Sequence, residues 1–178
     1  MSRSIPRSCH KVIPVFETVG AVFYPAVAFE QFRRGGTAMG GNAWSHAGPY
    51  QQDLTVAFQQ AQEETLAQDN HGFLARSVEE LWRDPAWQEY IFTGGTCTVL
   101  DFPLMIDATD TDDGPFMRPL TDGEVRAWAP HGRPTYEEWR DALDTERLEF
   151  PGRAQGNCTV LYRDGRPEQI GYWGVTAD

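Results

Sequence analysis

An Asp-Gly pair near the C-terminus, Asp164-Gly165, is the feature that most constrains how this chain folds. It separates two apolar, β-prone runs at residues 157–162 and 168–173. Asp-Gly between such runs is the strongest short-range signal for a β-hairpin, because a type I′ turn needs positive φ at both central residues. The sequence therefore predicts an antiparallel hairpin here, and the fold must contain a sheet that includes it.

Several helices are predicted upstream of this hairpin. Asp53 is a favourable N-cap, and apolar residues recur behind it at helical spacing to about residue 67. Asp84-Pro85 places a proline at the first position of another helix. Capping boxes, each a Ser or Thr followed three residues later by Glu, occur at Ser77–Glu80, Thr121–Glu124 and Thr135–Glu138.

Strand-like segments alternate with these helices, but without a regular βαβ order. Residues 96–102 are the most strand-like, and residues 11–16 and 19–24 are also rich in Val, Ile and Phe. The tetrapeptide Cys-Thr-Val-Leu occurs at 97–100 and again at 158–161. Both copies are predicted to lie in one sheet, since apolar β-prone runs must share a core. The order of elements favours an α+β fold with a largely antiparallel sheet.

The length of 178 residues fits a single domain, 1–178. Within it, residues 1–43 are predicted to form a strand-rich N-terminal segment, and residues 44–178 an α+β body. The three cysteines have no short spacing, so the sequence predicts reduced thiols and a cytoplasmic location. Motifs for metal or cofactor binding are absent from the sequence, which therefore predicts neither group.

Charge is unevenly spread along the chain, whose formal net charge is -11. Residues 1–50 carry five basic and two acidic side chains, whereas the remainder carries ten basic and twenty-four acidic ones. The excess of negative charge on residues 51–178 repels phosphate backbones and anionic lipid. The predicted partners are a basic protein or a small molecule, with no nucleic acid and no membrane.

Residues 44–178 contain a set of short motifs in a characteristic order. They are Trp44, Pro49-Tyr50, Asp53-Leu54, Ala57, residues 95–101, residues 162–167, Ile170, Gly174 and Asp178. With these pieces the chain resembles a family of small, uncharacterised, mostly actinobacterial proteins. Cys97 stands where the family pattern has a His. The family has no known activity, so the resemblance implies no catalytic residue.

The candidate site residues are single side chains. Cys97 is a candidate nucleophile with His46 or His71 as its base, although a Cys within a strand is usually a small buried hydrophobe. Trp44 lies in a Gly-rich region and is the best candidate for an exposed ligand-binding aromatic, with Tyr50 beside it.

Asp101 is the third catalytic candidate. If residues 96–102 form a strand, Asp101 shares a face with Cys97 and Val99 at the strand's end. A carboxylate buried there needs a partner, because burial without one costs several kcal/mol. It is either a structural loop clamp or ion-paired group, or a pocket carboxylate of raised pKa that acts as a base or orients His46.

Two functions from different classes remain open at this stage. The first is a stoichiometric acidic domain, of immunity or inhibitor type, that binds a basic protein; its charge and its lack of catalytic motifs favour it. The second is a small enzyme or ligand-binding protein of specialised metabolism with a pocket near Trp44, His46, Tyr50 and Asp101. A pocket with convergent polar groups would favour the second, and an acidic face with exposed aromatics the first.

Overall fold

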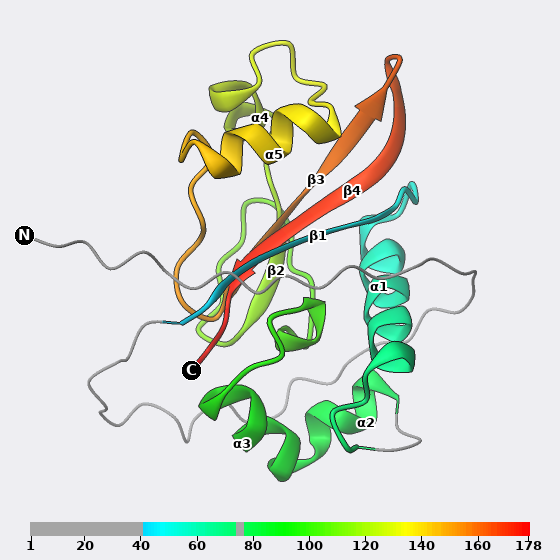
Figure 1. The fold of residues 1–178 in the computed structure, drawn as a ribbon, viewed down its shortest axis with the longest axis vertical. Helices are drawn as coiled ribbons and strands as arrows, with labels where there is room; N and C mark the ends of the chain where they lie inside the picture. Colours follow the sequence, from blue (N-terminus) through cyan, green and yellow to red (C-terminus); the bar gives the residue numbers. More distant parts are fainter. Residues whose placement is uncertain (1–40, 74–76) are drawn as a thin grey trace, which may run out of the picture.

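The fold is α+β, with helices on both faces of a four-stranded sheet (Figure 1). The computed structural model describes residues 41–73 and 77–178. The predicted strands at 11–16 and 19–24 lie outside the described residues. The first element of the described residues is the strand Ala43–Pro49, which forms one edge of the sheet.

The sheet has the order β1-β4-β3-β2 and is largely antiparallel. Its strands are β1 (Ala43–Pro49), β2 (Phe116–Pro119), β3 (Gln155–Arg163) and β4 (Arg166–Val175). The predicted hairpin is confirmed: β3 and β4 pair antiparallel around Asp164 and Gly165, both of which have positive φ. The short strand β2 pairs parallel with β3.

The predicted helix starts are confirmed. The helices are α1 (Leu54–Gln68), α2 (Val78–Arg83), α3 (Pro85–Thr93), α4 (Asp122–Trp128) and α5 (Tyr136–Asp144). The side chain of Asp53 accepts hydrogen bonds from two N–H groups of α1, and all three capping boxes close at α2, α4 and α5. None of the helices in the described ranges is long and apolar enough to cross a membrane.

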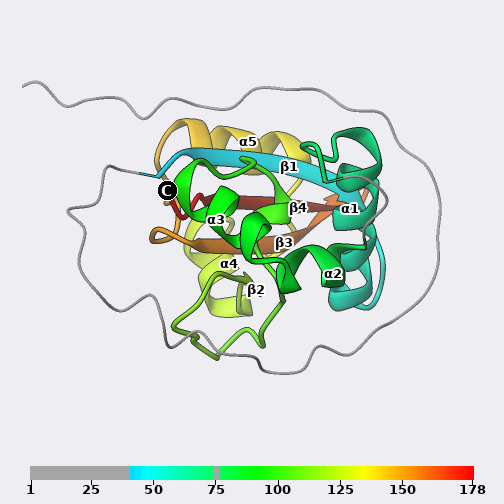
Figure 2. The ribbon, with the colours of Figure 1, turned by 90° about the horizontal axis from the view of Figure 1, so that it is seen from below.

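Side-chain alternation along β4 gives the two faces of the sheet separate cores. On one face Tyr172 packs with Trp44 of β1 and Phe58 of α1. On the other face Trp173 packs with residues of α4 and α5, including Trp139 at 6.2 Å between ring centroids. Figure 1 shows α5 and α1 on different sides of the strands, and in Figure 2, seen from below, α3 lies in front of the strands and α5 behind them. A third cluster joins α2 and α3 beneath the sheet.

The predicted strand at residues 96–102 is wrong. Val99–Asp101 form a single 3₁₀ turn, η2, and Cys97 has a φ of 56° that no strand residue adopts. The Thr98 side chain caps this turn by accepting a hydrogen bond from the Leu100 N–H at 3.1 Å. The two Cys-Thr-Val-Leu copies therefore do not share a sheet: 158–161 lie in β3, and 97–100 lie in a loop.

A glycine in β4 sets how closely α5 approaches the sheet. A Cβ added at Gly171 would lie 2.8 Å from the Trp139 ring. We expect Gly171→Ala to lower the free energy of unfolding by about 2 kcal/mol, because this ring belongs to a packed core that overfilling strains. Chemical denaturation measures the loss. Gly123→Ala, where the nearest atom is 3.9 Å away, is the matched control and should not destabilise.

Candidate functional site

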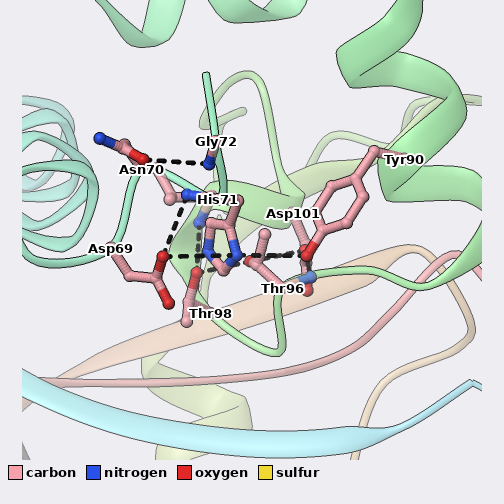
Figure 3. A network of polar contacts seen from close by, with 9 residues as sticks. Asp69, Asn70, His71, Gly72, Tyr90, Thr96, Thr98 and Asp101 are labelled. Carbon is pink, nitrogen blue, oxygen red and sulfur yellow. Dashed lines mark hydrogen bonds and ion pairs between the residues drawn. The ribbon is translucent and has the colours of Figure 1, made fainter. Parts of the chain in front are cut away.

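The best candidate for a functional site is the polar network around Asp101 (Figure 3). Asp101 ends η2 and is 1% exposed. Its loop follows α3, and its neighbours in the network are Tyr90 of α3 and His71 in the turn after α1. Segments that are distant in sequence thus supply the polar groups of one site.

The Asp101 carboxyl is held by its own loop. Oδ1 accepts hydrogen bonds from the Thr96 N–H at 2.6 Å and from the Thr96 hydroxyl at 2.8 Å. That hydroxyl also lies 2.6 Å from the hydroxyl of Thr98. Oδ2 is buried and has no hydrogen-bond partner among the described residues. One carboxyl oxygen therefore closes the loop and the other is left unsatisfied.

Burial raises the pKa of Asp101 from 3.8 to about 6. Hydrogen bonds from Thr96 oppose the rise, as do the nearby N–H groups of Thr98 and Cys97, because they favour the charged form. Desolvation is the larger effect, and the carboxyl binds its proton more tightly than an exposed Asp does. The raised pKa agrees with the hypothesis of a pocket carboxylate, whereas the hydrogen bonds from its own loop agree with the hypothesis of a structural loop clamp.

The backbone around Asp101 is unusual and tightly packed. Gly95 has a φ of 62°, and a Cβ there would lie 2.8 Å from the methyl carbon of Thr176 at the end of β4. On the other side, the buried amide of Gln62 in α1 donates to the Phe102 carbonyl at 2.7 Å. The loop is thus fixed between α1 and the last residues of the sheet.

Tyr90 and His71 form the outer part of the network. The Tyr90 hydroxyl lies 3.2 Å from Nδ1 of His71, which in turn lies 3.8 Å from the Asp69 carboxylate. Burial raises the pKa of Tyr90, and the negative charges of Asp69 and Asp101 raise it further. The arrangement keeps this phenol protonated and places it as a hydrogen-bond donor or acceptor beside the histidine.

The other predicted site residues gather around one core cluster rather than around Asp101. Trp44 is 2% exposed and packs on Phe102 at 5.8 Å between ring centroids, so the expectation of an exposed Trp44 is wrong. Tyr50 packs against the same cluster. His46 stacks on Tyr172 at 6.4 Å, and burial lowers its pKa. No hydrogen bond joins His46 to Asp101 among the residues described.

The cysteines differ from expectation. Cys97 is disulfide-bonded, so the prediction of reduced thiols is wrong for this residue and it offers no free nucleophile. Cys158 is free and fully buried, and burial raises the pKa of its thiol to about 12. Such a thiol is a packing residue. In the described ranges no three His, Cys, Asp or Glu side chains gather closely enough to hold a metal ion.

Comparisons with known protein families, with curated proteins and with solved structures find no match to this chain. The resemblance to small actinobacterial proteins therefore stays a prediction, and the function rests on the residues themselves.

Sequence reasoning identified Asp101 but missed Tyr90, Thr96 and Thr98 as its neighbours. The available signal was the spacing Thr-x-Thr-x-x-Asp directly after Gly94-Gly95. Short polar side chains at such spacing bond to nearby backbone N–H groups and compete with strand pairing. For Tyr90 the sequence offers no such signal, and only the folded structure places its hydroxyl beside His71.

Proposed function

We propose that this chain is a stoichiometric binding domain that recognises a basic protein through the surface formed by α5 and the loop after it, residues 136–150. The observation that carries the proposal is that this surface combines exposed aromatic side chains with unpaired carboxylates. We name it the α5 surface.

The two exposed large hydrophobic side chains of the described ranges flank this surface. Tyr136, at the start of α5, is 39% exposed, and Phe150, beyond its end, is 36% exposed. Large apolar side chains elsewhere in the described chain are more buried. Exposed aromatics are frequent anchors of protein interfaces, since they bury much area for few frozen torsions.

Acidic side chains fill the space between these aromatics. Asp141 and Asp144 are each ion-paired with an Arg of the same surface. Glu137, Glu146 and Glu149 are exposed and form no ion pair with a described residue. A basic partner would find three unpaired carboxylates here, and their field would raise its association rate.

The buried face of α5 suits it to carry such a surface. Trp139, Ala142 and Leu143 are buried against the sheet, so the helix is held rigidly while its opposite side faces solvent. A rigid interface loses less conformational entropy on binding than a mobile one. This architecture favours recognition of a folded partner in a defined orientation.

The alternative function, an enzyme or ligand-binding protein, has weaker support. Its proposed pocket residues Trp44 and Asp101 are almost completely buried, and Trp44 is engaged in core packing. The observation in its favour is the raised pKa of Asp101. That carboxyl is, however, bound by its own loop.

The test is a charge-reversal variant of the α5 surface, Glu137→Lys with Glu146→Lys and Glu149→Lys. Proteins captured from source-cell extract by the immobilised wild-type chain are identified, purified and titrated against it by calorimetry. We expect a basic protein bound at one-to-one stoichiometry. We expect the variant to weaken that binding at least about 100-fold, because three attractive contacts become repulsive.

A matched control makes the same charge change elsewhere. Glu63→Lys, Glu89→Lys and Asp110→Lys alter three exposed carboxylates outside the α5 surface. This control should change the affinity much less than the α5 variant does. Equal losses in both variants would leave only unspecific charge attraction, and the absence of any basic partner would reject the proposed function itself.

A further inference from the structure

Asp101 has a property that a loop clamp alone does not require. Its carboxyl is fully buried, yet one of its two oxygens has no hydrogen-bond partner in the described part of the chain. Oδ1 alone would satisfy the N–H and hydroxyl of Thr96. A buried charge with an unsatisfied oxygen disfavours the closed loop more strongly than a protonated carboxyl does, because burying an ionised group costs more than burying a neutral polar one.

The loop also carries side chains that fill the core on both sides of it. Val99 and Phe102 belong to the cluster beneath α1, and Leu100 belongs to the cluster of α2 and α3. Moving this loop would therefore loosen two helical packing regions together. A single titrating side chain sits at the point where both meet.

We propose that Asp101 is a proton-controlled latch, which holds the 95–102 loop closed when protonated and releases it to local opening when ionised. Opening lets water reach Oδ2, which no described group satisfies in the closed state. The device concerns the loop between α3 and β2, and it is independent of partner binding at the α5 surface.

The groups that face Asp101 do not neutralise its charge. Its own loop supplies hydroxyl and N–H groups of residues 96–98. Tyr90 comes from α3, and behind it lie His71 and Asp69 from the turn after α1. From the end of the sheet comes Thr176, whose hydroxyl donates to the carboxylate of Asp178, and from α1 the neutral Gln62. Within the described ranges no Arg or Lys forms an ion pair with Asp101.

The direction of the pH effect follows from the pKa of Asp101, which is about 6 in the folded chain and 3.8 when exposed. A raised carboxyl pKa stabilises the closed loop at low pH. That stabilisation is lost as the pH rises from about 4 to about 6, and little changes above this window. The open fraction is expected to grow on the order of 50-fold between pH 4 and pH 8.

Hydrogen exchange of the full chain, followed by NMR, tests the latch without a ligand. The reporters are the amides of Thr96 and Leu100, whose hydrogen bonds belong to the loop. After correction for intrinsic exchange, their protection should fall roughly 50-fold from pH 4 to pH 8. It should also lie below the protection of central β3 and β4 amides, since the loop opens locally. Equal protection in loop and sheet, or no change with pH, would overturn the latch.

Two variants assign the titrating group. Asp101→Asn keeps an acceptor for Thr96 but cannot ionise, so the pH dependence of protection should disappear. His71→Asn removes the imidazole of the network, and the backbone φ of 50° at this position suits Asn. The pH dependence should persist in this variant, and its loss there would assign the effect to His71 and refute the proposal. A ¹³C titration of the wild-type Asp101 carboxyl provides a variant-free check, with an expected midpoint near 6.

Discussion

Trp44→Ala is expected to lower the free energy of unfolding by about 3 to 5 kcal/mol, one of the largest effects of any single substitution in this chain. The indole is 2% exposed and packs on Phe102, so its removal leaves a cavity between β1 and η2. In a chain of this length the loss corresponds to roughly 10 °C or more in melting temperature. Denaturant unfolding, monitored by far-UV circular dichroism, measures it.

Trp44→Phe is the matched control. The indole N–H of Trp44 has no hydrogen-bond partner among the described residues, so a phenyl ring loses volume but no hydrogen bond. We expect it to cost less than half of the Ala variant's loss. A stable Trp44→Ala protein that no longer bound a small molecule would instead restore Trp44 as a ligand-binding residue and contradict the core assignment.

The local signals of the sequence predicted much of the fold because the atoms that carry them are local. At the start of α2, the Ser77 side chain accepts a hydrogen bond from the Glu80 N–H, and the Glu80 carboxylate accepts one from the Ser77 N–H. The Asp164-Gly165 turn likewise needs only its own φ angles. Features that are stabilised by interactions within four or five consecutive residues can be predicted without knowledge of the rest of the chain.

The repeated Cys-Thr-Val-Leu tetrapeptide shows where prediction from local sequence fails. At 158–161 the tetrapeptide is part of β3 and pairs with β4, because the hairpin places the two strands side by side. At 97–100 the local hydrogen bonds of Thr98 and Asp101 satisfy the backbone instead, and the apolar side chains reach the core from a turn. β-propensity describes fit to a sheet surface, so it cannot decide between these contexts.

The candidate site was predictable only in part for the same reason. Asp101 was identified because a carboxylate in an apolar run is conspicuous in any sequence. Its burial could be expected, but its partner Thr96 depends on the positive φ of Gly95 and Cys97. The strands β1 and β2 were not predicted either, since a Pro in each of them, and also Ser and Gly in β1, weaken the strand pattern.

Trp139→Ala and Tyr136→Ala should separate the structural face of α5 from its proposed binding face. Trp139 is 1% exposed and packs on Trp173 and against Gly171, and its replacement should cost about 3 to 5 kcal/mol in free energy of unfolding. Tyr136 is 39% exposed, and its replacement should cost no more than about 1 kcal/mol.

The effects on partner binding should have the opposite order, once each variant is measured where it is fully folded. Tyr136→Ala removes an anchor of the α5 surface and should weaken the basic partner's binding by at least about 10-fold. Trp139→Ala keeps every exposed side chain of that surface and removes only the ring on which Tyr136 packs, at 5.8 Å between centroids, so below its melting temperature it should bind with a smaller loss. The comparison uses one helix and two aromatic residues three positions apart, which excludes differences in net charge. If Tyr136→Ala bound its partner with unchanged affinity, the exposed aromatic would not be an anchor, and the proposed α5 interface would retain only its carboxylates.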